Sequence, residues 1–241
     1  MRCTTGAALQ LLGAGFAAQA APSAEVLDLA GRVHYGYYHD EPRTIEAAIE
    51  ALDRLGESPD VIYYLDFAAF RHVQLGAADR TALARLHTCS ERDAAPGLDK
   101  RATAEAWVLV AACAEVAGND SRREDALARA RERDDDNPRM ALVEAWALAR
   151  KAGTDAAQRE AVAAKLAAVV EAFDAWSPPI DDPDWGYAEA LTGLAAAALE
   201  RGQARTARDL IERALLLAPD YGAALDLRAA LQNARAGDRA P

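Results

Sequence analysis

The sequence predicts an all-α protein that folds as an α-solenoid of antiparallel helical hairpins. Hydrophobic residues make up 51% of the 241-residue chain, and strong helix formers such as alanine and leucine dominate whereas β-branched clusters are scarce. Apolar residues recur with the 3.6-residue period of a helix in one segment after another. The segments end at glycine, proline or Asx clusters, and the hairpins that they form recur at about 30 to 45 residues, which is typical of a solenoid.

Each helix is expected from its apolar period and its end signals. Pro42 begins the second helix after a polar bend, because proline is favoured in the first turn. Gly76, Gly118 and Gly202 end first helices of later hairpins, and Pro138 heads another. The expected pairs, joined by about two to five residues each, are 24–39 with 43–55, 60–75 with 78–92, 100–117 with 121–134, 138–152 with 155–175, and 184–201 with 204–217, before a last capping helix at about 220–235.

The segment 188–221 has the most regular spacing of the chain. It resembles one 34-residue unit of the tetratricopeptide repeat (TPR) family, with apolar or small residues at the helix-contact positions, a turn glycine and a closing proline. Only Ala198 departs, because a large residue is usual there. The matching residues are Leu191, Leu194, Ala195, Gly202, Ala207, Ile211, Ala214 and Pro219.

Two earlier units resemble the repeat more loosely. One carries Trp107, Val110, Ala111 and Gly118, and the other carries Leu65, Ala68, Ala69 and Gly76. The chain is therefore similar to exported bacterial TPR-containing proteins of unassigned role. The resemblance implies a non-enzymatic scaffold or adaptor of the bacterial cell envelope, which binds a protein or peptide on the concave face of the solenoid.

The segment from about 155 to 186 departs from the repeat pattern. Its helix is longer than a repeat helix, and the proline- and aspartate-rich stretch SPPIDDPDWG that follows cannot stay helical. Asp181, Asp182 and Asp184 of this stretch lack the glycine and the terminal glutamate of a calcium loop. We interpret the stretch as a solvated loop before the next helix, which is expected to begin near Pro183–Gly186.

The formal net charge of −11 disfavours nucleic acid as a partner, because phosphate binding needs clustered lysine and arginine. The arginines alternate with acidic residues, as in DSRREDALARARERDDD, which is typical of a solvated helix face. The acidic balance favours a neutral or basic partner.

The N-terminal residues have the pattern of a secretory leader. Arg2 precedes an apolar and small-residue stretch over about 7–18, and Ala18-Gln19-Ala20 is an A-x-A cleavage pattern. We expect a signal peptide at 1–20 cleaved after Ala20, a repeat domain at 21–236, a disordered tail at 237–241, and a periplasmic or secreted protein. No later apolar run has the length of a membrane span.

Removal of the leader would leave two cysteines, Cys89 and Cys113. Two cysteines in an exported chain are a candidate disulfide; the alternative is two small buried residues that never meet. In the frame of the resembled repeat, Cys89 lies on the second helix of one unit and Cys113 on the first helix of the next. Such helices are neighbours, so a disulfide is geometrically feasible.

No catalytic residue and no cofactor is predicted. The chain has no glycine-rich loop after a strand and no Gly-x-Ser-x-Gly elbow. His34 and His39 are five residues apart, so they do not share a helix face as paired metal ligands would. The alternative is a metal site that combines His39, Asp40 or Glu41 with His72.

An aromatic patch in the early units is the predicted partner-binding surface. Tyr35 and Tyr38 are three residues apart and can share one helix face. The alternative is that at least half of the rings fill the spaces between helices. The patch residues are Tyr35, Tyr38, Tyr63, Tyr64 and Phe70.

Two other functions are kept beside peptide binding. One is an envelope accessory protein that binds a metal or small molecule through the His- and Tyr-rich N-terminal hairpins. The other is a self-associating structural scaffold, which would be a homo-oligomer.

Overall fold

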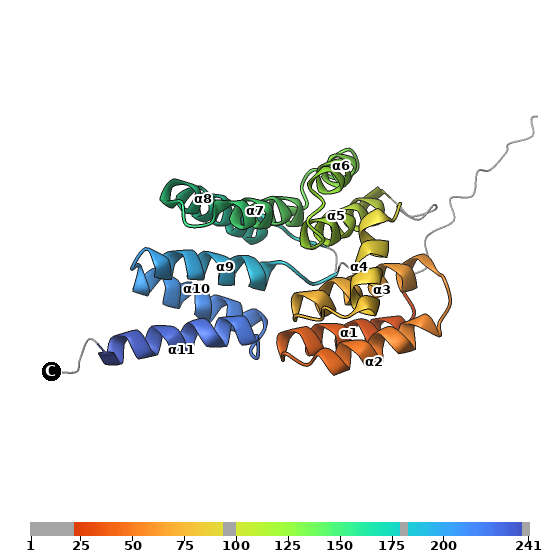
Figure 1. Ribbon diagram of the computed structural model, residues 1–241, viewed down its shortest axis with the longest axis horizontal. Coiled ribbons are helices and arrows are strands. Elements are labelled where there is room, and N and C mark those ends of the chain that lie inside the picture. The colour runs from red at the N-terminus through yellow and green to blue at the C-terminus, as the bar shows by residue number, and fades with distance from the viewer. Residues whose placement is uncertain (1–21, 94–99, 179–182, 238–241) are drawn as a thin grey trace, which may run out of the picture.

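The computed structural model describes residues 22–93, 100–178 and 183–237 (Figure 1). These residues form eleven α-helices and no strand, as predicted. The signal peptide expected at 1–20 and residues 238–241 of the expected tail lie outside them. The helices are α1 (Ala24–Tyr38), α2 (Pro42–Asp53), α3 (Pro59–Gln74), α4 (Arg80–Glu91), α5 (Lys100–Val116), α6 (Asp120–Arg131), α7 (Pro138–Ala152), α8 (Ala156–Ala175), α9 (Tyr187–Glu200), α10 (Ala204–Leu217) and α11 (Gly222–Gly237).

The helix starts follow from local sequence. Pro42, Pro59 and Pro138 lie in first turns, where the missing N–H of proline costs no helical hydrogen bond. Asp79 and Asp155 are N-caps whose side chains accept hydrogen bonds from backbone N–H groups of α4 and α8. These local signals explain why the predicted helix ends lie within a few residues of the observed ones.

The helices stack as an α-solenoid, which confirms the predicted fold class. The two helices of each hairpin pack together, and the first helices of neighbouring hairpins pack side by side, α1 on α3, α3 on α5 and α5 on α7. Figure 1 shows the hairpins following one another around a curved stack. One continuous core of apolar residues runs through the stack.

The regular stacking changes after α8, which has 20 residues. Among the described helices, α9 packs closely on α8, α10 and α11 but not on α7. The helix also begins at Tyr187, later than the predicted start at 184. Gly186 before it has φ +101°, a left-handed conformation that favours glycine. The helix starts later than predicted because residues Pro183–Gly186 run across the concave side before it.

The chain curves until its last hairpin meets its first. Tyr221, just before α11, has its hydroxyl 3.3 Å from the Tyr37 hydroxyl of α1. Asp220 Oδ2 lies 3.2 Å from His39 Nε2 in the bend after α1. Figure 1 shows the start of α11 next to the end of α1. The concave side is thus enclosed by the chain itself.

A disulfide joins the second and third hairpins. Cys89 of α4 and Cys113 of α5 are bonded, with their Cα atoms 6.0 Å apart. Both side chains are fully buried. The bond links adjacent helices from neighbouring hairpins, which is the arrangement that the repeat frame implied.

No helix in the described part of the chain is both long enough and apolar enough to span a bilayer.

Candidate functional site

The centre of the concave side is filled by Trp185. Its side chain is only 1% exposed, and its ring lies 6.3 Å from Phe67, 5.9 Å from Phe70 and 6.4 Å from Trp146, measured between centroids. Phe67 and Phe70 belong to α3, and Trp146 belongs to α7. The segment between α8 and α9 therefore supplies an aromatic plug that packs against α3 and α7.

A buried carboxylate holds this plug in place. Glu105 of α5 is 3% exposed. One of its oxygens accepts hydrogen bonds from Trp185 Nε1 and from the Tyr63 hydroxyl, each at 2.8 Å. Its other oxygen accepts from Asn137 Nδ2 at 2.8 Å and pairs with Arg139 Nη1 at 3.3 Å. Buried charges of this kind persist only when paired and hydrogen-bonded.

Arg139 ties the same carboxylate to the crossing segment. Its guanidinium is 2% exposed, and its Nε donates to the backbone carbonyl of Trp185 at 2.9 Å. Its Nη2 donates to the carbonyl of Pro183. Carbonyls that would face an apolar core are thereby satisfied, which is why an irregular segment can lie here.

A second buried ion pair joins α3 to α9. Arg71 is fully buried and pairs with Glu189, whose second oxygen accepts from the Gly186 N–H at 2.9 Å. The Arg71 guanidinium also lies 3.9 Å from the centre of the Tyr37 ring. Burial opposes its charge, but the adjacent Glu189 carboxylate raises the pKa of Arg71 above its usual range.

The predicted aromatic patch is mostly inside the protein. Only Tyr35 is exposed, at 49%, whereas Tyr64 and Phe70 are buried, and Tyr38 and Tyr63 are partly buried against the core. Burial raises the pKa of the Tyr38 and Tyr63 hydroxyls well above their usual range. Four of the five rings thus fill spaces between helices, which is the alternative given for this patch, because Trp185 packs on α3 and Tyr221 packs on Tyr38 of α1.

Tyr35 and Tyr38 also do not share one environment. Tyr35 stacks on His39 with 3.9 Å between ring centroids. Tyr38 instead packs against Tyr37 and Tyr221, at 5.3 Å and 5.1 Å. The end of α1 therefore faces the C-terminal hairpin on one side and solvent on the other.

The histidines proposed as alternative metal ligands are separate. His39 pairs with Asp220, and His72 Nε2 lies 3.3 Å from Glu46 Oε1. Among the described residues, neither belongs to a group of three close metal-ligating side chains. The structure therefore does not bring together the set expected from His39, Asp40, Glu41 and His72.

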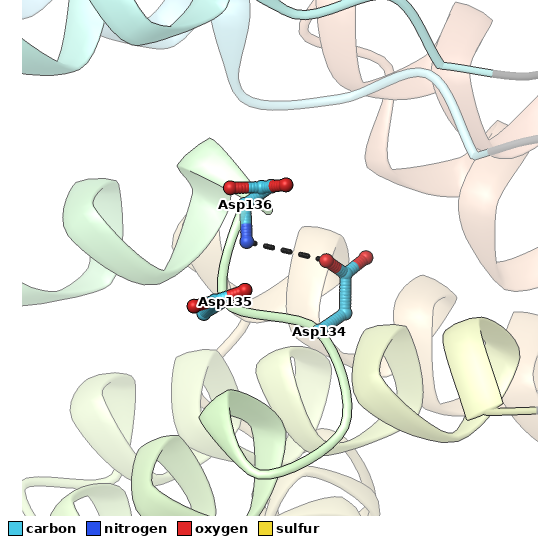
Figure 2. Close-up of side chains that lie close together, drawn as sticks. All are labelled: Asp134, Asp135 and Asp136. Atoms are coloured by element: carbon cyan, nitrogen blue, oxygen red, sulfur yellow. Dashed lines mark hydrogen bonds between the residues drawn. The ribbon is translucent and has the colours of Figure 1, made fainter.

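One acidic group does form, in the loop between α6 and α7. Asp134, Asp135 and Asp136 have carboxylate oxygens within 4.8 Å of one another. Figure 2 shows them on successive positions of the loop, with the Asp136 N–H donating to Asp134 at 3.2 Å. Asp135 and Asp136 are exposed, as is common for aspartates of a solvated loop.

The open space lies where α7 and α9 part. A cavity of about 450 Å³ is bounded by α1, α3, α7, α9 and α11, and a second of about 270 Å³ is bounded by α7, α8 and α9. Trp146, Gly193 and Ala196 line both, so the two cavities are adjacent, and together they are here called the α7–α9 groove. Both cavities lie beside α9, which does not pack closely on α7 among the described helices.

Sequence reasoning identified none of the residues that line this groove. Trp146 and Gly193 match ordinary helix positions in the repeat pattern, and Ala196 is one alanine in a run of four. The only available signal was the departure from the pattern over 155–186, which marks where the stacking changes. It could not show that Trp185 would turn inward.

Comparison with known proteins finds similarity to solved structures alone. No protein-family model matches the chain, and no curated protein matches it significantly. A solved structure of a thermophilic TPR protein from Thermus thermophilus is similar, with a TM-score of 0.46 and 22% sequence identity, over 88% of this chain and 98% of that chain. The α-solenoid assignment stands on the packing of the helices themselves.

Proposed function

We propose that this protein is a non-enzymatic peptide-binding scaffold that takes a peptide segment in the α7–α9 groove. The observation that carries the proposal is the groove itself, which leaves open space on a concave side that is otherwise filled. Concave, largely apolar clefts with a few polar groups are the usual places for ligands.

The composition of the groove suits a peptide backbone. Small residues on α7 and α9 leave room for close approach of a chain, and Trp146 offers an aromatic surface at the junction of the two cavities. Aromatic anchors of this kind contribute strongly to protein interfaces. The small lining residues of the narrower cavity are Ala145, Ala149, Ala152, Gly153, Gly193, Ala196 and Ala197.

Ala196→Trp is expected to abolish peptide binding while the protein stays folded. Ala196 faces both cavities, so an indole there occupies the groove. A random peptide library displayed on phage would be selected on the immobilised wild-type protein and on the variant. Wild-type protein should enrich a family of related peptides, and Ala196→Trp should lose them.

Ala128→Trp is the matched control, because Ala128 is exposed on α6 and does not line the groove. It should select the same peptides as the wild type. Enrichment of the same peptides by Ala196→Trp would exclude the groove as the binding site. A wild-type selection without any enriched family would argue against peptide binding altogether.

We further infer that the protein works in the bacterial envelope, in the periplasm or outside the cell. The secretory pattern of the first 20 residues supports export, and disulfides persist in oxidising compartments. A chain purified from its native cells with thiols blocked should begin at Ala21 and carry no free thiol at Cys89 or Cys113. Cys89→Ser should lower the free energy of unfolding by about 3 kcal/mol, because the unfolded chain is no longer constrained by the disulfide. Free thiols and an intact leader would contradict export.

A further inference from the structure

We propose that the wider end of the α7–α9 groove binds a basic side chain, arginine or lysine, of the peptide. This end, the cavity between α1, α3, α7, α9 and α11, is here called the cation pocket. The inference rests on the proposed function and names the chemistry of the partner at one position.

The lining of the cation pocket has the composition of a cation-binding site. It carries the carboxylates of Glu189 and Asp226 and the aromatic side chains of Tyr37, Trp146 and Tyr221. Among the described residues, no lysine, arginine or histidine lines it. Aromatic rings attract guanidinium and ammonium groups across their faces, and an adjacent carboxylate adds a charge-assisted hydrogen bond.

The two carboxylates are not equivalent. Glu189 is committed to Arg71 and to the Gly186 N–H, so its charge is already balanced within the protein. Asp226 of α11 is exposed and has no ion-pair or hydrogen-bond partner among the described residues. Asp226 therefore supplies the free negative charge of the pocket.

The nearest buried cation does not cancel this charge. Arg71 is 0% exposed and paired with Glu189, and its guanidinium lies over the Tyr37 ring. The phenols at the pocket stay uncharged, since burial raises the pKa of both Tyr37 and Tyr221. An incoming basic group thus meets neutral rings and one unpaired carboxylate. The formal charge of −11 also attracts a basic peptide from a distance.

The size of the pocket favours a long side chain. Its volume of about 450 Å³ exceeds what a guanidinium alone fills, so the aliphatic stem of arginine or lysine also finds room against Leu227 and the rings. Long basic side chains bury their stems in this way while the charged end reaches a polar partner.

An arginine peptide and its neutral isostere test the proposal directly. The probes are acetylated and amidated Ala-Ala-Arg-Ala-Ala and the same peptide with citrulline, whose urea group has nearly the shape of guanidinium but no charge. Binding to the full chain would be followed by the ¹⁵N-edited NMR signal of the Trp146 indole, assigned with Trp146→Phe. The arginine peptide should shift this signal to saturation, and the citrulline peptide should bind about tenfold more weakly.

Asp226→Asn should weaken the arginine peptide by about tenfold. Asp209→Asn is the matched control, because it makes the same charge change at an exposed position of α10 outside the pocket. It should leave binding within about twofold. Both aspartates are exposed, so neither variant is expected to alter folding.

Equal binding of the arginine and citrulline peptides would overturn the proposal, and so would equal weakening by the two aspartate variants. Absence of any shift with the arginine peptide would also overturn it. The phage selection tests the proposed function separately. If the wild type selects peptides that Ala196→Trp does not select, the groove remains the proposed peptide site even though it does not require a basic side chain.

Discussion

Arg71→Met is expected to lower the free energy of unfolding by about 3 to 5 kcal/mol. Arg71 is fully buried, and its only ion-pair partner in the described residues is Glu189, which is itself 6% exposed. Removing the guanidinium leaves the Glu189 carboxylate charged in a low-dielectric interior, where desolvation is costly. Urea denaturation followed by circular dichroism measures the loss.

The double variant Arg71→Met, Glu189→Met separates the cost of the orphaned charge from the value of the pair. Replacing both members of a buried pair with apolar residues is often neutral or stabilising. Arg71 Nε has no hydrogen-bond partner among the described residues, so this pair is incompletely satisfied. We expect the double variant to recover most of the stability that Arg71→Met loses.

The matched control is Arg205→Met on α10, where the arginine is exposed. It should change the free energy of unfolding by less than about 0.5 kcal/mol. A loss from Arg71→Met that is no larger than this would show that the interior around α3 and α9 is open to water. A double variant as unstable as Arg71→Met alone would show that the guanidinium stabilises by packing on Tyr37 and the other rings.

Glu105→Ala is expected to cost about 3 to 5 kcal/mol for a related reason. The substitution takes the Glu105 carboxylate away from the buried Arg139 guanidinium. It also removes the acceptor of Tyr63 and Asn137 and the nearer of two acceptors of the Trp185 indole, and each buried donor left without a partner adds to the cost. Denaturation in urea gives the free energy.

Glu105→Gln should lie between wild type and Glu105→Ala, because the amide keeps one acceptor oxygen but loses the charge. Glu212→Ala, at an exposed position of α10, is the control and should be nearly neutral. If Glu105→Ala were as mild as Glu212→Ala, the carboxylate would not be what holds Trp185 inside. The fluorescence of Trp185 should shift to longer wavelength in Glu105→Ala if the plug is released.

Stability and the groove are linked through Trp185. Its indole N–H donates to Glu105, its backbone carbonyl accepts from Arg139, and its ring stacks on Trp146, which lines both cavities of the groove. We therefore expect loss of this network to displace Trp146, against which Trp185 stacks. Glu105→Ala is therefore a variant in which stability and peptide binding fall together, whereas Ala196→Trp blocks the groove without loss of the network.

The helices could be predicted from the sequence because their signals are local. The periodicity of apolar residues, the prolines at 42 and 138 and the glycines of the turns act within one helix or one turn. The regular unit at 188–221 has its small residues buried at the helix contacts, with Ala195, Ala207 and Ala214 each 0% exposed. The pairing of Cys89 with Cys113 follows from the same nearest-neighbour frame.

The concave side could not be predicted in the same way. The aromatic residues of α1 and α3 looked like a surface because a regular solenoid exposes its inner face. Here the chain after α8 breaks the repeat and places Trp185 on that face. Arg71 and Glu189 are 118 residues apart in sequence, and no local pattern indicates that they meet.

By itself, the sequence determined that this protein is a stack of helical hairpins, placed the helix ends to within a few residues, and made a bond between Cys89 and Cys113 feasible. Only the tertiary structure decided that Trp185 packs on the inner face against α3 and α7, and that Asp226 lines one cavity together with Tyr37, Trp146 and Tyr221. The physical reason is range: helix signals and hairpin contacts act between near neighbours, whereas the closure depends on buried pairs between distant segments, whose energy exists only after the chain has curved.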